Sequence, residues 1–160
     1  MLRKILVVLL IIIIIIQFIR PTPNKDQGKQ QNYIGTVYPV PEDVMAILDK
    51  ACMDCHSNNT RYPWYDKIQP VAWWLNYHVR EGKKKLNFDE FLSSTPKKQD
   101  DNMKEVVKQV KENEMPLKSY TWIHKDAILS PEEKTKIMDW GAAIRKKVDS
   151  ATGFVPDNKN

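Results

Sequence analysis

Cysteine and histidine are both scarce in this sequence, which has two cysteines and three histidines among 160 residues. A structural zinc site needs four ligands, usually supplied as two closely spaced pairs. His78 and His124 lie far apart in the sequence, and neither has a second ligand nearby. The sequence therefore argues against a structural zinc site.

The alternating pattern of β-strands is rare as well, and helical patterns are frequent. A redox-active Cys-x-x-Cys pair of the thioredoxin kind is expected between alternating strands and helices, which this sequence lacks. The chain carries a net charge of +5 but has no basic stripe with interleaved aromatic residues. We therefore expect no nucleic-acid partner. The lysines at 83–85 and 97–98 read as solvated loop charge, with a docking patch for an acidic redox partner as the alternative.

Both cysteines fall in one run of five residues, Cys52-Met53-Asp54-Cys55-His56. A Cys-x-x-Cys-His run is the attachment signature of c-type haem. On one turn of backbone, the two sulfurs reach the two vinyl groups on one edge of the porphyrin, and the adjacent imidazole supplies the proximal iron ligand. A plain disulfide would leave His56 without a role. We therefore predict one covalently attached haem c.

Residues 5–16 are a nearly unbroken apolar run, which follows Arg3 and Lys4 and continues to Ile19. A transmembrane helix needs about 20 such residues. No small-residue cleavage site and no lipobox cysteine follow the run. We expect residues 1–19 to be an uncleaved signal anchor that forms a transmembrane helix, with a cleaved signal peptide as the alternative.

Covalent haem attachment takes place on the exported side of a bacterial inner membrane. A single-pass protein of that membrane is expected, with its haem domain in the periplasm. The stretch 20–37 is rich in Pro, Gln, Asn and Lys, which is typical of a flexible linker. The haem domain is predicted to cover residues 38–149, and a disordered tail to cover residues 150–160.

The haem domain is predicted to be all-α. The last helix has the clearest start, because Ser130-Pro131-Glu132-Glu133 is a capping box with proline at the first helical position. Apolar residues at helical spacing indicate earlier helices at about 41–53, 70–81 and 100–112.

Two glycines have a predicted role in this helical domain. Gly82 should end the helix at 70–81. Gly141, beside Trp140, indicates close approach to another helix, most simply the one at 41–53.

Met115 is the candidate distal iron ligand. It precedes Pro116 in a predicted loop, where a thioether can be aimed at an iron; methionines within helices more often fill gaps in the core. His78 is the alternative ligand, because it shares the apolar face of its helix. A histidine on such a face is more often a hydrogen-bonded core residue.

Arg61, Trp64 and Tyr65 are candidates for the haem environment. Arg61 could pair with a haem propionate, and the two aromatic rings could wall the haem edge. Ordinary surface charge and core packing are the other readings. The carbonyl of a residue near Pro63 or Pro70 is expected to accept the proton of the free nitrogen of His56.

The order of helix, Cys-x-x-Cys-His, further helices, Met-Pro loop and capped last helix resembles a class I monohaem cytochrome c. More specifically, the chain is similar to a family of small membrane-attached bacterial haem-binding domains over about residues 38–147. The segments that carry this resemblance are 56–58, 62–65, 69–71, 78–79, 86–88 and 115–116, with Tyr120, His124, 129–130 and Trp140. The resemblance implies covalent haem c, a cytochrome c-like all-α fold around it, and a redox role.

The expected function is that of a membrane-anchored monohaem c-type cytochrome, which passes electrons between respiratory or peroxidase-type redox partner proteins. With His56 and Met115 on the iron, no coordination position is left for a substrate, so we do not expect an enzyme. The alternatives are a haem-based sensor, or a peroxidase-associated haem domain, with a labile distal site. A metal-binding or purely structural anchor protein, without haem, is the remaining reading.

Overall fold

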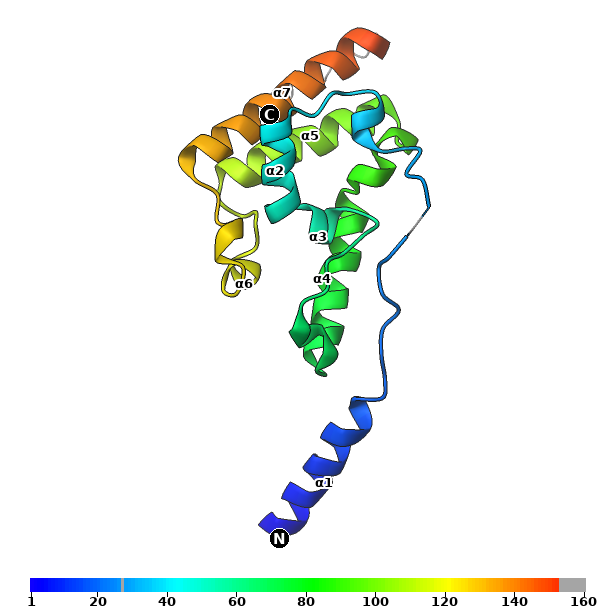
Figure 1. The fold of residues 1–160 in the computed structure, drawn as a ribbon, viewed down its shortest axis with the longest axis vertical. Helices are drawn as coiled ribbons and strands as arrows, with labels where there is room; N and C mark the ends of the chain where they lie inside the picture. The colour runs from blue at the N-terminus through cyan, green and yellow to red at the C-terminus, as the bar shows by residue number, and fades with distance from the viewer. Residues whose placement is uncertain (27, 153–160) are drawn as a thin grey trace.

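The computed structural model describes residues 1–26 and 28–152. The elements in it are helices, and the only β-type pairing among the described residues is an isolated bridge between Lys25 and Asn59. The prediction of an all-α fold is confirmed. The α-helices, drawn in Figure 1, are α1 (Leu2–Ile16), α2 (Glu42–Ala51), α3 (Met53–His56), α4 (Val71–Lys85), α5 (Pro96–Lys111), α6 (Lys118–Thr121) and α7 (Pro131–Thr152). Short 3-10 helices are η1 (Ile34–Thr36), η2 (Trp64–Lys67), η3 (Phe88–Ser93) and η4 (Lys125–Ala127).

The expected capping box begins α7. The Glu133 N–H donates to Ser130 Oγ at 3.2 Å, and the Ser130 N–H donates to Glu133 Oε2 at 2.9 Å. Two N–H groups that have no partner within the helix are thereby satisfied. The helix continues to Thr152, so it includes the first residues of the expected tail. The rest of that tail, 153–160, lies outside the described residues.

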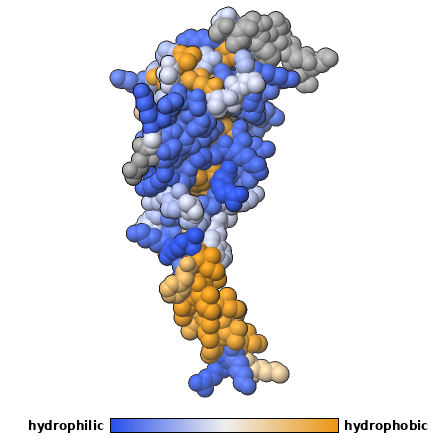
Figure 2. All heavy atoms as spheres, turned by 90° about the vertical axis from the view of Figure 1, so that its right-hand side faces the viewer, coloured by the Kyte–Doolittle hydropathy of each residue, from blue (hydrophilic) through white to orange (hydrophobic). Residues whose placement is uncertain are grey.

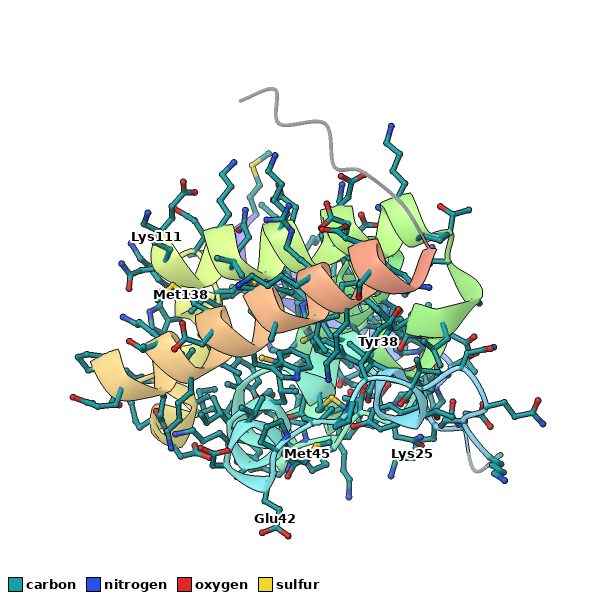
Figure 3. All side chains as sticks on the ribbon, turned by 90° about the horizontal axis from the view of Figure 1, so that it is seen from above. Lys25, Tyr38, Glu42, Met45, Lys111 and Met138 are labelled. Carbon is teal, nitrogen blue, oxygen red and sulfur yellow. The ribbon has the colours of Figure 1, made fainter. Side chains whose placement is uncertain are left out.

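Helix α7 packs along α5, and the two run side by side in Figures 1 and 3. A Cβ atom added to Gly141 would lie 2.9 Å from Val107 Cγ2. The expected close approach at Gly141 is therefore present, but its partner is α5 and not the first helix of the domain. The glycine marks a close approach in the sequence but not its partner, which is α5, the long helix that precedes α7 across the short α6.

The hydrophobic core lies between α2, α5, α7 and the two 3-10 helices η1 and η3. Its largest fully buried side chains are Phe88, Phe91, Ile34, Leu48, Met103, Ile137, Ile144 and Val148. Each such side chain contributes about 1.5–3 kcal/mol relative to an exposed one. Ile34 belongs to this core, so the packed domain begins before residue 38.

The stretch 20–37, for which a flexible linker is predicted, is bound to the body. The Asn24 side chain donates to Ser57 O and to Thr60 Oγ1, both at 2.9 Å, and the Asn24 N–H donates to the Tyr62 hydroxyl at 2.6 Å. Further along, Ile34 is fully buried. The sequence does not indicate that this stretch binds to the body, because the contacts of Asn24 are made by polar and backbone groups. Such contacts leave no apolar period in the sequence.

From Ile5 onwards, helix α1 is apolar on every side. The side chains from Ile5 to Ile15 are each about half exposed, and the helix stands out as a continuous hydrophobic surface in Figure 2. It stops at Ile16, where the Gln17 amide donates back to Ile13 O and also to Gln69 O of the body. In the described ranges no helix has the length and apolarity needed to span a membrane. The predicted transmembrane helix at 1–19 is thus not supported.

Candidate haem site

The five-residue motif forms a single turn at the end of a packed helix. Helix α2 ends at Ala51, Cys52 follows it, and α3 (Met53–His56) continues in a new direction. The N–H groups of Cys55 and His56 both donate to Cys52 O, at 3.1 and 2.9 Å. Because these bonds close one turn, both thiols and the imidazole reach the same cavity, as the motif predicts.

This cavity has a volume of about 190 Å³ and lies between α3, α4 and the loop that leads into α6. Its walls include both residues that the sequence nominates as distal ligand. The lining consists of Ala51, Cys52, Asp54, Cys55, His56, His78, Glu81, Gly82, Lys85, Met115, Pro116, Leu117 and Tyr120. We call it the motif cavity.

His56 is held in one orientation by the end of α4. Its Nδ1 lies 2.9 Å from Leu86 O, and because a carbonyl only accepts, the Nδ1–H donates and Nε2 keeps its lone pair. Burial lowers the pKa of His56, which favours the neutral ring that a metal requires. The buried Phe88 ring packs edge-on against the imidazole. The acceptor expected near Pro63 or Pro70 is therefore Leu86 instead.

Gly82 lies inside α4, which continues to Lys85, so the predicted helix end at this glycine is wrong. A Cβ atom at Gly82 would lie 2.8 Å from Cys55 O and 3.2 Å from Cys55 Cβ. The glycine is needed for close approach, because it lets α4 pack directly on the motif. The end of α4 can then contact His56. A local sequence pattern cannot distinguish this use of glycine from a helix stop.

The two thiols are held in protonated form. Burial raises the pKa of Cys52 to about 12 and that of Cys55 to about 11. A redox-active dithiol has a lowered pKa instead, so this site does not suit that chemistry. Nor do the described residues contain a group of three or more His, Cys, Asp or Glu side chains that could hold a metal ion.

Met115 and His78 enter the motif cavity from different elements. Met115 lies in the loop after α5, which is held by the Glu114 N–H donating to Gln109 O at 2.9 Å. His78 is on α4, where its ring packs 4.3 Å from the Trp74 ring and its Nδ1 lies 2.8 Å from Trp74 O. The structure thus brings both candidate ligands to the cavity that contains His56.

A second cavity of about 540 Å³ adjoins the first at three shared residues, His56, Lys85 and Met115. Its remaining lining residues are mostly polar or charged, namely Leu86, Lys98, Asp101, Asn102, Glu105, Val106 and Gln109. The two cavities therefore meet at His56 and Met115.

Arg61, Trp64 and Tyr65 lie outside the described lining of these two cavities. The Arg61 guanidinium pairs with Asp54 Oδ1 at 3.0 Å and with Asp49 Oδ2 at 2.9 Å, and it also donates to Asp49 O. Trp64 is 74% exposed. The structure therefore does not bring these three residues to the cavity that contains the cysteines.

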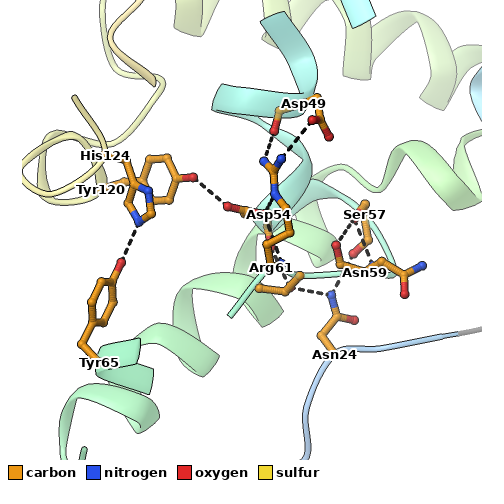
Figure 4. Close-up of polar contacts among 10 residues, drawn as sticks. Asn24, Asp49, Asp54, Ser57, Asn59, Arg61, Tyr65, Tyr120 and His124 are labelled. Carbon is orange, nitrogen blue, oxygen red and sulfur yellow. Dashed lines mark hydrogen bonds and ion pairs between the residues drawn. The ribbon is translucent and has the colours of Figure 1, made fainter. Parts of the chain in front are cut away.

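A hydrogen bond that sequence reasoning missed joins the motif to the Met115 loop (Figure 4). The Tyr120 hydroxyl donates to Asp54 Oδ2 at 2.8 Å, and its ring stacks on His124 with centroids 4.3 Å apart. Burial and the neighbouring Asp54 carboxylate raise the pKa of Tyr120. His124 Nε2 in turn lies 2.7 Å from the Tyr65 hydroxyl. Asp54 is a variable position of the Cys-x-x-Cys-His pattern, so the motif alone gives no signal for this contact.

Comparison with known families decides the class of the protein. The family model described as a haem-binding domain matches residues 11–143, which is more than half of the chain. The protein belongs to this haem-binding domain family.

This haem-binding domain protein also has a curated relative, the cytochrome c peroxidase Ccp of Escherichia coli (strain K12). The two are 28% identical over 140 residues, which cover 84% of this chain and 30% of the relative. The chain thus spans less than a third of the length of the peroxidase it matches. No solved structure matches the chain significantly.

Proposed function

We propose that this haem-binding domain protein is a monohaem c-type cytochrome that carries single electrons between redox partner proteins. The observation that carries the proposal is the motif turn: Cys52, Cys55 and His56 face one cavity, and the Nε2 lone pair of His56 is left free by the bond to Leu86. When bound there, haem iron accepts and returns one electron. The chain's own residues hold the haem, exclude water from it and set its potential.

In this proposal, Cys52 and Cys55 form the thioethers and His56 is the proximal ligand. Met115 is the distal ligand, and it is favoured over His78 because it lines both cavities as His56 does. The rings around His78 already hold its imidazole against α4. A His/Met pair raises the reduction potential of a haem, whereas two histidines would lower it.

The second cavity suits the charged edge of a haem. Lys85 and Lys98 supply ammonium groups in its lining, beside the carboxylates of Asp101 and Glu105. Ammonium groups form short, charge-assisted hydrogen bonds with carboxylates. Arg61, which the sequence nominated for this role, is already neutralised by two aspartates. We therefore assign propionate binding to the two lysines.

We further propose that α1 attaches the protein to the bacterial inner membrane, with the haem domain in the periplasm. The exposed apolar side chains of α1 support this, because a surface of that size is otherwise unfavourable in water. The chemistry of the motif supports the compartment, since haem c is attached on the exported side. Redox partner proteins would then meet the haem domain at that membrane.

A second candidate is a peroxidase-associated haem domain with a labile distal ligand. The similarity to the E. coli cytochrome c peroxidase favours it. In that case the domain still delivers electrons, while the peroxide chemistry takes place in another domain or protein. We propose no enzymatic activity for this chain, because His56 and Met115 would both hold the iron and leave no place on it for a substrate.

Carbon monoxide binding to the reduced, haem-loaded full chain separates the two candidates. An electron carrier with a firm distal ligand should show no change in its reduced spectrum on addition of carbon monoxide, and no peroxide turnover above that of a small soluble cytochrome c. Fast and complete carbon monoxide binding would overturn the electron-carrier proposal in favour of the labile site.

A further inference from the structure

The large apolar side chains that stay exposed on the described body gather in two segments. From residue 20 onwards they fall within residues 64–77 and 122–128, apart from Val37. Four of the five tryptophans are among them, and the fifth, Trp140, is in the core. We call the following residues the aromatic edge: Trp64, Ile68, Trp73, Trp74, Trp122 and Ile123.

Side-chain contacts show that the two segments are neighbours. The Tyr65 hydroxyl, next to Trp64, lies 2.7 Å from His124 Nε2, and the two rings are in edge contact. Figure 1 shows the lower end of α4 and the α6 region along the lower side of the body, the side from which α1 extends. The aromatic edge is thus one region on the α1 side of the molecule.

Helix α1 is fastened to the same region. Gln69 Nε2 and Trp73 Nε1 both donate to Ile19 O, at 2.8 and 2.9 Å, while the Gln69 N–H donates to Gln17 Oε1 at 2.9 Å. Gln69 is buried, so two of these three bonds are made by a residue that is held within the body. These bonds therefore fix the position of the end of α1 relative to the aromatic edge.

We propose that the aromatic edge rests in the headgroup layer of the bilayer that α1 enters, so that the body sits on the membrane surface in one orientation. This inference rests on the membrane attachment proposed above. Tryptophan favours the membrane interface, where its ring body is apolar and its N–H meets polar groups. The surface is continuous with α1 through the Trp73–Ile19 bond, which favours lipid over a soluble protein as its occupant.

The charges around the aromatic edge fit an anionic bilayer surface. Arg20, Lys67 and Lys125 are exposed in the segments that carry it or join it to α1, and the exposed Lys118 begins α6, just before the second segment. The acidic groups in the same segments are Asp66 and Asp126. This excess of cations is attracted to anionic headgroups.

The test uses the haem-loaded full chain in vesicles of mixed zwitterionic and anionic phospholipid. An environment-sensitive fluorophore is attached in Lys125→Cys, beside the aromatic edge, and in Lys146→Cys on α7 as the matched control. Cys52 and Cys55 are consumed in the thioethers. Each sample is floated with its vesicles, and a headgroup-linked quencher lipid is then included.

We expect both variants to float with the vesicles, and the label at position 125 to lose roughly half of its emission to the quencher, as an interfacial site should. The label at position 146 should keep its emission. If both variants float and the two labels are quenched equally little, the aromatic edge faces water and the inference is wrong, while the membrane attachment stands. If neither variant floats, the attachment itself fails and the inference falls with it.

Discussion

Tyr120 donates its hydroxyl to Asp54 Oδ2 at 2.8 Å and thereby ties the loop that carries Met115 to the motif that carries His56. The two residues are 66 positions apart in sequence, and Tyr120 lines the same cavity as both ligand candidates. The bond spans the two halves of the proposed iron site. Its strength should therefore govern how firmly the distal ligand is held.

Tyr120→Phe keeps the ring that stacks on His124 and removes only the hydroxyl. Asp54 retains Arg61 as a partner, so we expect a loss of about 1–2 kcal/mol in the free energy of unfolding. The far-red absorption band of a methionine–iron bond in the ferric protein should weaken. Tyr77→Phe, at a ring that is 61% exposed, is the control and should change neither quantity. An unchanged band in Tyr120→Phe would show that the bond does not hold the loop.

Gly82→Ala tests the contact between α4 and the motif. In an unconstrained helix this change stabilises by about 1 kcal/mol. Here the added Cβ meets Cys55 O at 2.8 Å, so we expect a net loss of about 1–3 kcal/mol and a lower yield of attached haem. Both are measured on the purified protein, by denaturant unfolding and by the ratio of haem to protein absorbance.

Gly28→Ala provides the comparison for that experiment, since its added Cβ would meet only the Asp26 side chain, at 3.0 Å. It should leave the haem yield unchanged. A stabilised Gly82→Ala protein with full haem content would contradict the packing described here.

Met115→Ala and His78→Ala separate the two candidate distal ligands. Loss of Met115 should abolish the far-red band, allow carbon monoxide to bind the reduced protein and lower the midpoint potential. Loss of His78 should leave all three properties as in the parent protein. Redox titration followed by absorbance measures both variants. The reverse pattern would assign the distal position to His78.

The acid stability of the last helix should depend on Glu133. Its carboxylate lies 2.6 Å from Lys50 Nζ and accepts from the Ser130 N–H, and these contacts lower the pKa of Glu133. A lowered folded-state pKa stabilises the folded protein above the unfolded pKa, and that contribution is lost as the pH falls through the folded value. A glutamine at position 133 can still accept the hydrogen bond from the Ser130 N–H, but it carries no negative charge.

Glu133→Gln should therefore lose up to about 1 kcal/mol of unfolding free energy at pH 7. The gap to the parent protein should close as the pH falls below about 4, because the parent then loses its own charge. Denaturant unfolding at a series of pH values gives this gap. In a Lys50→Met background the gap should be smaller at pH 7, and an equal gap there would remove Lys50 from the explanation.

The sequence predicts the parts of the site that depend on short spacing. Cys52, Cys55 and His56 share a cavity because one turn of backbone joins them, and the capping box at Ser130 is likewise local. Met115 also lines the cavity. The sequence could predict this because the Met-Pro loop is recognisable from its own residues.

What the sequence does not predict depends on contacts between distant segments. The acceptor for His56 is Leu86, 30 residues away, and Gly82 and Gly141 serve helix packing whose partners follow only from the tertiary fold. Nothing in the sequence around Arg61 indicates that it pairs with Asp49 and Asp54. The contacts of Asn24 are polar, so no apolar period predicts that its segment binds to the body.

The most direct measurement is the intact mass of the full chain, purified from a host with a haem c attachment system, together with its pyridine haemochrome spectrum. The account predicts a mass that exceeds the polypeptide by one haem after denaturation, with the α-band of a haem bound through two thioethers, and the loss of both in Cys52→Ser with Cys55→Ser. A denatured chain with the mass of the bare polypeptide, its cysteines free or merely oxidised, would contradict it.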